Sequence, residues 1–483
     1  MSATDRADNS AWMARRYHGA DLSLTAEDVP HSSLREGFFG RMFRGLSPFE
    51  PSDGHLDELA ETMFPTLAPQ GGQNPLRDSA IPAGYTYLGQ FIDHDITFDP
   101  TSTLQRRNDP DALHNFRTPR LDLDSLYGSG PVDEPFMYKA DGLRLRVGES
   151  EDRQPDLPRT TGPKREDRRA LIGDRRNDEN VIVSQLHLAF IQFHNRVVMD
   201  LKDAGKIPPS RLFDEAQQIV RWHYQWLVVN DFLPLIVGRE LVNHILGADD
   251  GHNEYPVWTI RGRRRDVPEK RTARIFEPKL LFFTWRNQPF MPVEFSAAAY
   301  RFGHSMVRPF YALNDVTTGE NAIPRFLTEE EKTQTGKHDL SGFGQRQSGL
   351  TIDWRRLFML PNGTTEDRRR VQPARKIDTQ LARGLDHLPR DRAASTDAAL
   401  AQILKALPKR NLRRGKAVGL PTGQDVARAM GIPDALILRD AELGLKGGLR
   451  EAFGESTPLW YYILREAEVW NEGACLGPAG GGV

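Results

Sequence analysis

Apolar residues recur at spacings of three and four along the segment that follows Asp178. The repeating positions are Ile182, Leu186, Phe190, Phe193, Val197 and Leu201. This spacing places all of them on one face of a helix. Gly205 and Pro208 then interrupt the pattern, as residues that end helices do. The sequence therefore predicts a long amphipathic helix between Asp178 and Gly205.

A second helical pattern runs from about Phe213 to Leu233, and we expect it to end near Pro234. Further segments with helical spacing are residues 293–308, about 398–408, 423–430 and 457–468. Residues 103–116 and 148–172 are rich in charge, proline and glycine and are typical of loops. Strand signals are few and short. These patterns predict a mainly α fold with long loops and little β structure.

Residues 1–60 are polar and are punctuated by glycine and proline, so we interpret them as an N-terminal arm packed on a main body of residues 61–483. A chain of 483 residues is long enough to form two or three domains. The fraction of hydrophobic residues, 39%, is enough for one large core. We expect a single large domain behind the arm.

The formal net charge of −2 gives no field that would attract nucleic acid or an anionic membrane. The basic run 261–265 is accordingly interpreted as a solvated loop. A single cysteine, Cys475, excludes a disulfide scaffold and suits a reducing compartment. The first residues lack the apolar core of a secretory signal, and no run is long enough to span a bilayer. We expect a soluble, cytoplasmic monomer, with non-classical export left open.

The segment from Gly84 to Asp99 packs Gln90, Asp93, His94 and Asp95 between apolar neighbours. On a helix, which turns about 100° per residue, the first three fall on one face, and Asp95 lies roughly 100° beyond His94. Asp93, His94 and Asp95 therefore cannot converge on one metal ion. Burying polar groups without partners is costly, so the shared face indicates a polar ligand or cavity. For an isolated Asp-His-Asp, a core histidine satisfied by neighbouring aspartates is the alternative.

The run Gly-Gln-Phe-Ile-Asp-His-Asp at 89–95 resembles the distal helix of the animal-type haem peroxidases, within the peroxidase–cyclooxygenase superfamily, and suggests a bacterial-like member. Other segments resemble further motifs of that family and follow in the family's order. They are residues 117–128, 173–179, 300–310 and 410–421. The resemblance implies one large helical haem-peroxidase domain that binds haem b.

On the proximal side, Arg-Phe-Gly-His at 301–304 resembles the family's iron-binding motif. The resemblance implies that His304 ligates the haem iron and that Arg301 pairs with a haem propionate. It also implies that Asn411 accepts a hydrogen bond from the other ring nitrogen of His304. Arg414 would bind the second propionate. Taken alone, these residues would be a structural histidine and a basic surface turn.

On the distal side, the resemblance implies that His94 is the acid and base that moves a proton between the two oxygens of hydrogen peroxide. Arg176 corresponds to the family's catalytic cation, and its neighbour Arg175 is the alternative. Gln90 lies where a halide or a water binds. A positioned cation stabilises the negative charge that develops as the O–O bond breaks.

Two carboxylates, Asp93 and Glu179, correspond to those that form ester bonds with haem methyl groups in mammalian members of the family. Covalent attachment through one or both is therefore an expectation. Asn180 stands where some members carry a methionine that bonds a haem vinyl group. That third link cannot form here.

The loop around residues 118–124 resembles the family's calcium site. Thr118, Asp122 and Asp124 offer side-chain oxygens, and the carbonyl of Arg120 lies between them. Asp95 would add a carboxylate from the distal helix. Calcium favours several oxygen ligands of these types. A polar turn is the alternative interpretation.

The long helix carries His187 and His194 seven residues apart. Metal-binding pairs favour a spacing of one turn, so we interpret both as structural.

The sequence thus predicts an oxidoreductase that reduces hydrogen peroxide and oxidises halide, thiocyanate or phenols, in keeping with a response to oxidative stress. A fatty-acid dioxygenase of the same superfamily is the first alternative. Its radical tyrosine stands three residues before the proximal histidine, where this chain has Arg301, with Tyr300 one residue away. A calcium-stabilised interaction protein without activity is the second alternative, although every expected catalytic residue is present.

Overall fold

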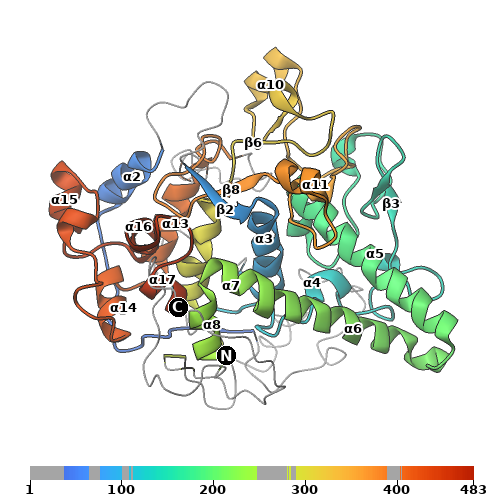
Figure 1. The fold of residues 1–483 in the computed structure, drawn as a ribbon, viewed down its shortest axis with the longest axis horizontal. Helices are drawn as coiled ribbons and strands as arrows, with labels where there is room; N and C mark the ends of the chain where they lie inside the picture. Colours follow the sequence, from blue (N-terminus) through green and yellow to red (C-terminus); the bar gives the residue numbers. More distant parts are fainter. Residues whose placement is uncertain are drawn as a thin grey trace, which may run out of the picture.

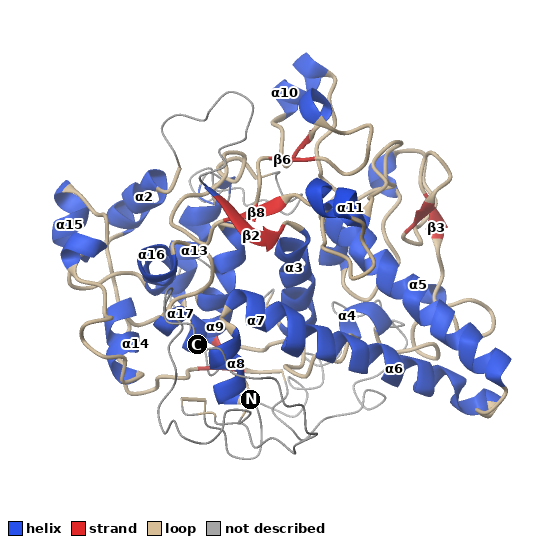
Figure 2. Ribbon diagram, viewed as in Figure 1, coloured by secondary structure: helices blue, strands red, loops and turns tan. Residues whose placement is uncertain are grey.

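The computed structural model describes residues 37–64, 77–99, 108–109, 113–246, 280, 282–283, 290–388, 403 and 405–483. The basic run 261–265 lies outside these residues. Helices of varied length surround a central helix, α3, which spans Gly84–Ile96 (Figure 1). Figure 2 shows that the strands are short, and that some lie close to α3 whereas others lie at the edge of the view. The expectation of a mainly α fold with little β structure is confirmed.

The remaining α-helices of the described residues are α2 (Asp53–Thr62), α4 (Asp124–Tyr127), α5 (Val181–Ala204), α6 (Leu212–Leu227), α7 (Leu233–Ile236), α8 (Arg239–Ile245), α9 (Val293–Ala297), α10 (Glu329–Thr335), α11 (Thr365–Arg370), α13 (Leu407–Ala417), α14 (Gly423–Ala429), α15 (Gly447–Phe453), α16 (Leu459–Asn471) and α17 (Pro478–Gly482). The strands are β1 (Phe39–Gly40), β2 (Asp78–Pro82), β3 (Gly148–Glu149), β4 (Pro155–Asp156), β5 (Met291–Pro292), β6 (Phe310–Tyr311), β7 (Ile323–Pro324) and β8 (Pro373–Arg375). β1 pairs in parallel with β5, and the pairs β2–β8, β3–β4 and β6–β7 are antiparallel.

The long predicted helix is α5, and its two ends follow from the sequence. The side chain of Asn180 accepts hydrogen bonds from the backbone N–H groups of Ile182 and Val183, so Asn180 is the N-cap. Gly205 closes the helix with a φ of 63°, a left-handed conformation that glycine adopts without a steric penalty. α5 packs against α3 on one side and α6 on another. It therefore supports the central helix along its length.

The second predicted helix corresponds to α6 and its direct continuation, which ends at Ile236, two residues beyond Pro234. α6 passes at Val228 into a π-helical turn that ends at Phe232, and α7 begins directly afterwards. Pro234 is the second residue of α7, and Phe232 and Leu233 before it are also helical, so the helix continues through this proline before it ends. The predicted end of the helix is therefore confirmed to within a few residues, and the π-helical turn within it was not predicted.

Residues 293–308 do not form one helix. α9 breaks at Ala298, whose φ of −132° and ψ of −73° are not helical, and a 3-10 helix follows from Ala299 to His304. The helices predicted at 423–430 and 457–468 are confirmed by α14 and α16. Much of the helix predicted at about 398–408 lies outside the described residues.

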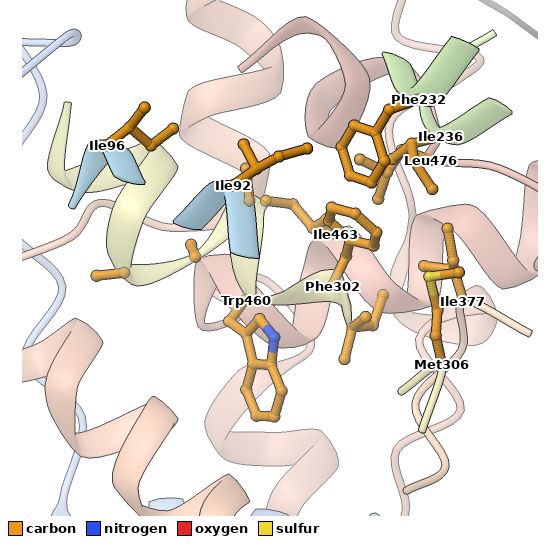
Figure 3. Packing of buried hydrophobic residues seen from close by; sticks show 14 of the residues in the cluster. Ile92, Ile96, Phe232, Ile236, Phe302, Met306, Ile377, Trp460, Ile463 and Leu476 are labelled. Atoms are coloured by element: carbon orange, nitrogen blue, oxygen red, sulfur yellow. The ribbon is translucent and has the colours of Figure 1, made fainter. Parts of the chain in front are cut away.

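A shared apolar core fixes the relation between α3, the 3-10 helix before His304 and α16. Figure 3 shows Ile92 of α3, Phe302 of the 3-10 helix and Trp460 of α16 pointing into this core. All three are buried. α2 lies across the predicted arm boundary at residue 60, and its apolar face, with Leu59 fully buried, belongs to the same core. Among the described residues, no helix is both long and apolar enough to cross a membrane.

Candidate active site

A cavity of about 430 Å³ opens between α3, the two 3-10 helices Arg175–Asp178 and Ala299–His304, and α13. The residues predicted on the haem side line it, except Asn411, which lies buried behind His304. The lining residues from that prediction are Gln90, Asp93, His94, Arg176, Glu179, Arg301, His304 and Arg414. Four separate stretches of sequence thus supply one polar cavity.

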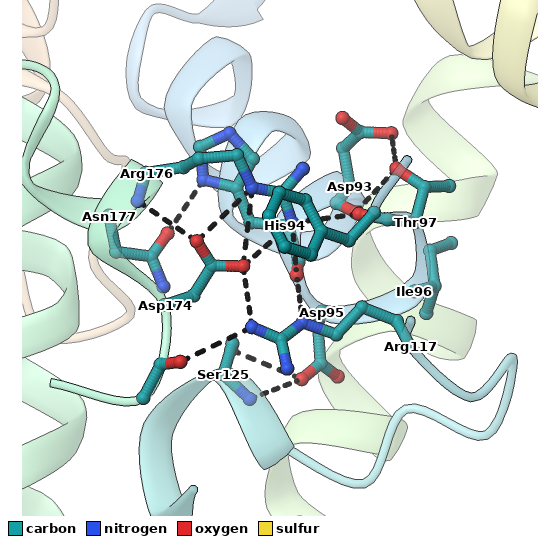
Figure 4. A network of polar contacts seen from close by, with 12 residues as sticks. Asp93, His94, Asp95, Ile96, Thr97, Arg117, Ser125, Asp174, Arg176 and Asn177 are labelled. Atoms are coloured by element: carbon teal, nitrogen blue, oxygen red, sulfur yellow. Dashed lines mark hydrogen bonds and ion pairs between the residues drawn. The ribbon is translucent and has the colours of Figure 1, made fainter. Parts of the chain in front are cut away.

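His94 is buried in the distal wall of this cavity. Its Nδ1 donates a hydrogen bond to the side-chain oxygen of Asn177 at 2.8 Å, because an amide oxygen can only accept (Figure 4). Burial lowers the pKa of His94, and the nearby cation of Arg176 lowers it further. The imidazole is therefore neutral, with Nε2 as the nitrogen that retains a lone pair.

Arg176 lies beside His94 and is held by fixed partners. It forms an ion pair with Asp174 at 2.7 Å, and its Nη2 donates to the carbonyl oxygens of His94 and Thr97 at 3.0 and 2.7 Å (Figure 4). Its guanidinium also lies over the ring of Phe98, 4.5 Å from the ring centroid. Nη1 makes no hydrogen bond to any described residue. That nitrogen is the donor left for a ligand in the cavity.

Arg175 points elsewhere. Its guanidinium lies 5.9 Å from the centroid of the Phe343 ring, the residue is exposed, and it does not line the cavity. Of the two neighbouring arginines, the geometry therefore favours Arg176 for contact with a ligand.

Gln90 and Glu179 are linked in the cavity wall. Gln90 donates to a carboxylate oxygen of Glu179 at 2.9 Å and accepts from the amide nitrogen of Asn180, also at 2.9 Å. Arg325 lies 3.9 Å from the same Glu179 oxygen. Asp93 accepts a hydrogen bond from the hydroxyl of Thr97 at 2.9 Å. Both candidate ester-forming carboxylates thus line the cavity and have polar partners.

His304 and Arg301 are brought to one face by the 3-10 helix, in which residues three apart lie above each other. Asn411 contacts both. Its amide oxygen accepts from Arg301 at 2.7 Å, so its amide nitrogen faces Nδ1 of His304 at 2.8 Å. Asn411 contacts His304 as predicted, but with the nitrogen of the amide rather than the oxygen. A half-turn of this amide would exchange the two roles and release Arg301.

The wall that holds His304 is rich in positive charge. Arg301, Arg410 and Arg414 all line it, and Arg414 forms an ion pair with Asp99. Burial lowers the pKa of Arg301 to about 10, and the neighbouring cation of Arg414 contributes. Burial, together with Arg301, lowers the pKa of His304 to about 3. This wall therefore suits an anionic group, next to a neutral histidine.

Asp95, as its helical position predicts, lies away from the cavity and meets the loop that precedes α4. Carboxylate oxygens of Asp95, Asp122 and Asp124 lie within 4.8 Å of one another, and the hydroxyl of Thr118 donates to Asp122 at 2.7 Å. Burial and the neighbouring carboxylates raise the pKa of Asp95 and Asp124. Arg117 gives partial compensation, 3.3 Å from Asp124.

The backbone of this loop is strained. Leu121 and Leu123 have φ values of 56° and 59°, a region that branched residues rarely occupy. The carbonyl oxygen of Arg120 accepts from Gln225 at 3.4 Å. Such strain persists where surrounding structure or a ligand fixes it.

His187 and His194, both interpreted as structural, are buried on α5 and hydrogen bonded. His194 contacts the hydroxyl of Tyr127 and the carbonyl oxygen of Leu143. His187 contacts Asn177. Asn177 and Asp174 were not predicted as site residues. The one feature of the sequence that pointed to them is that they lie close to Arg176 in the chain. Arg410 was not predicted either, although it directly precedes Asn411 in the segment 410–421, and no local pattern pointed to Arg325.

The family model for animal haem peroxidases matches residues 103–351, just over half of the chain. The chain belongs to this family. The match covers the loop around Asp122, the Arg176 segment and His304. The distal helix α3 lies outside the matched range.

Curated relatives match parts of the chain. The chorion peroxidase of Aedes aegypti is 30% identical over 162 residues, which is 33% of this chain and 15% of that protein. The mouse eosinophil peroxidase is 29% identical over 144 residues, 29% of this chain and 15% of that protein. The human thyroid peroxidase is 25% identical over 335 residues, 61% of this chain and 31% of that protein. The chain thus covers less than a third of each relative's length.

Two solved structures show the same fold. Peroxidase A from Dictyostelium discoideum superposes with a TM-score of 0.58 at 16% identity, covering 93% of this chain and 86% of that one. A fatty acid alpha-dioxygenase from Arabidopsis thaliana gives 0.53 at 14% identity, covering 92% and 70%. The fold of these two structures therefore extends over nearly the whole chain. Membership of the family supports an oxidoreductase.

Proposed function

We propose that this animal haem peroxidase family member reduces hydrogen peroxide and oxidises small electron donors such as halide, thiocyanate or phenols. The observation that carries the proposal is that His94 and His304, from separate elements, line one cavity together with Arg176. A neutral histidine with a positioned cation beside it can move a proton and stabilise developing charge. A second neutral histidine can ligate a metal.

The residues around the cavity fit a haem group. A Cβ atom added to Gly303 would have no atom within 4 Å, so the backbone beside His304 leaves room for a flat ring. Arg301 and Arg414 would hold the two propionates, and an added anion would offset the burial and the repulsion from Arg414 that together lower the pKa of Arg301. His304 would ligate the iron once Asn411 turns its amide oxygen to the ring.

Haem, when bound, supplies the redox chemistry of peroxide cleavage. The residues of this chain direct it. Nε2 of His94 takes the proton from the near oxygen of hydrogen peroxide and returns it to the leaving oxygen. Nη1 of Arg176 donates to the oxygen on which negative charge develops. Gln90, whose side chain is held by Glu179 and Asn180, contributes a fixed polar edge at which a halide or water would bind.

Asp93 and Glu179 would bind the haem edge covalently. Each ester would join one carboxylate oxygen to a haem methyl carbon in place of one C–H bond. Hydrogen peroxide would accept the two electrons, the proton from that C–H bond and one further proton from solvent, which gives two water molecules. The support is that both carboxylates line the cavity.

Calcium would bind where Asp95, Asp122 and Asp124 meet. Three carboxylates within 4.8 Å of one another, with the Thr118 hydroxyl and the Arg120 carbonyl on the same loop, match the oxygen ligands that calcium favours. A cation there would relieve carboxylate repulsion and would anchor the residue that directly follows His94.

The function is tested by adding haem to the purified protein and measuring peroxide consumption that depends on a phenolic donor. We expect turnover in the native protein and a loss of about 10²–10⁴-fold in His94→Gln. His194→Gln is the matched control, because His194 is also buried but does not line the cavity, and its hydrogen bonds join it to Tyr127 and Leu143. Equal turnover in all three proteins would refute the assignment of His94.

A fatty-acid dioxygenase is the second candidate, favoured by the position of Tyr300. This tyrosine lines the cavity, and its hydroxyl donates to the carbonyl oxygen of Gly89 at 3.1 Å. Burial, together with Asp93, raises its pKa. Oxygen consumption with a long-chain fatty acid, lost in Tyr300→Phe, would establish this reaction in place of peroxide reduction.

A further inference from the structure

One amide side chain connects the distal histidine to a second histidine outside the cavity. The oxygen of Asn177 lies 2.8 Å from Nδ1 of His94, and its nitrogen lies 3.0 Å from Nδ1 of His187. Asn177 and His187 are fully buried and His94 is 5% exposed. The three side chains form a continuous chain of hydrogen bonds from the cavity wall into the core.

The chemistry of the amide determines where the protons lie. Its oxygen only accepts, so Nδ1 of His94 carries a proton and Nε2 carries the lone pair. Its nitrogen only donates, so Nδ1 of His187 carries the lone pair and Nε2 carries the proton. The two histidines must therefore have opposite tautomers. A turn of the amide would reverse both of them together.

His187 is suited to accept from Asn177. Burial lowers its pKa to about 3, so the ring is neutral and its Nδ1 is available. Its Nε2 is buried and has no hydrogen-bond partner among the described residues, and the ring packs edge-on against Phe91 of α3. An unsatisfied buried N–H group costs stability. The contact with Asn177 is therefore the one hydrogen bond that the ring of His187 makes among the described residues.

The elements on both sides hold the amide in place. Asn177 lies in the 3-10 helix next to Arg176, and its backbone N–H donates to the carbonyl oxygen of Asp174 at 3.0 Å. His187 is in the second turn of α5. Neither residue lines the cavity. They can act on a ligand only through His94.

We propose that Asn177 and His187 are positioning residues that hold His94 in its Nδ1–H tautomer, so that Nε2 faces the cavity as a base. This inference rests on the proposed function, in which His94 moves the peroxide proton. Nδ1 of His187 accepts a hydrogen bond from the amide nitrogen of Asn177, and the amide oxygen accepts one from Nδ1 of His94. Without His187 the amide turns, and His94 loses the tautomer that it needs.

The tautomers are measured directly on the full chain without added haem. The protein is labelled with 15N-histidine, and long-range 1H–15N spectra distinguish the two ring nitrogens. Variants His94→Gln and His187→Gln identify two of the 13 histidines by the signals that disappear. We expect the Nδ1–H form for His94 and the Nε2–H form for His187. Any other pair of tautomers overturns the proposal, whether or not haem binds.

The positioning role is tested on the haem-loaded protein by the rate of reaction with peroxide. Asn177→Leu removes both hydrogen bonds and should slow the reaction about 10- to 100-fold, since part of the acid–base contribution is lost. Asn177→Asp keeps an acceptor for His94 and should recover most of the rate. His187→Phe leaves the amide without its acceptor and should shift the tautomer signal of His94 and slow the reaction.

Two controls separate positioning from general damage. His194→Gln should change neither the tautomer of His94 nor the rate. kcat/KM for the electron donor should stay within about twofold in the Asn177 variants, because it reports the later reaction with the donor and only the earlier proton transfer is affected. If the expected tautomers are found but Asn177→Leu reacts as fast as the native protein, the positioning role is refuted while the proposed function stands.

Discussion

Replacing Arg176 with alanine, compared with the same change at Arg175, gives the sharpest test of which arginine acts in the cavity. Arg176 contacts Asp174 and the carbonyl oxygens of His94 and Thr97, whereas Arg175 lies on the surface over Phe343. The two residues are neighbours of the same type. They differ only in where their side chains lie.

The expected magnitudes follow from these contacts. Loss of one positioned donor to a developing negative charge slows the reaction about 10²–10³-fold. Arg176→Ala also removes charge-assisted hydrogen bonds, each worth roughly 1.5–3 kcal/mol when buried. Because the Arg176 side chain is 23% exposed and Arg117 still pairs with Asp174 at 2.7 Å, we expect a stability loss of about 2–4 kcal/mol. Arg175→Ala should stay within about 0.5 kcal/mol of the native protein.

The stability loss should depend on pH in a defined direction. Burial raises the pKa of Asp174, but Arg176 and Arg117 hold it below its ordinary value. A carboxylate with a depressed folded pKa contributes stability above its unfolded pKa, about 4, and loses it as the pH falls toward the folded pKa. The difference between native and Arg176→Ala protein should therefore be largest near pH 7 and should shrink below about pH 4.

The assay combines two measurements on haem-loaded proteins. Stopped-flow mixing with hydrogen peroxide gives the rate of the first reaction, and urea unfolding at pH 7 and pH 3.5 gives the free energy of unfolding. The reaction rates are measured under conditions well below the denaturation midpoint of each variant, so that a slower reaction is not caused by unfolding. A reversed order, with Arg175→Ala the slower variant, or equal mild effects in both would refute the reasoning.

Two further predictions concern the calcium loop and the carboxylates. Asp122→Ala, or exhaustive chelation, should lower the thermal midpoint and slow the reaction with peroxide together, because ligand binding stabilises the folded loop beside His94; metal analysis that finds no calcium, with neither property changed, contradicts this. After brief treatment with peroxide, acid–organic extraction should leave haem on the polypeptide, less so in Asp93→Val and not at all in Asp93→Val with Glu179→Gln. Complete extraction from the treated native protein would show that no ester forms.

Local periodicity predicted the parts of the fold and site that depend on one element. The shared face of Gln90, Asp93 and His94, and the separation of Asp95 from it, follow from helical geometry, and all four lie as expected. The ends of α5 follow from a capping asparagine and a left-handed glycine. These features depend on residues that are close in the sequence, so they can be predicted from the sequence alone.

Features that depend on tertiary contacts were not predicted. The π-helical turn from Val228 to Phe232 is a register change that packing imposes on an otherwise helical pattern. The position of Arg325 near Glu179 joins residues more than a hundred apart in the chain. The two hydrogen bonds that join His94, Asn177 and His187 require contact among three separate elements. The periodicity of one element cannot predict contacts between elements.

The central claim is that the cavity holds haem with His304 as the iron ligand, and a spectroscopic titration tests it most directly. Haem is added to native protein, to His304→Ala and to His304→Ala with free imidazole, and the absorption spectrum is followed. We expect saturable binding with a histidine-ligated ferric spectrum in the native protein, its loss in His304→Ala and its partial return with imidazole. A native-like ferric spectrum in His304→Ala without imidazole would contradict the assignment.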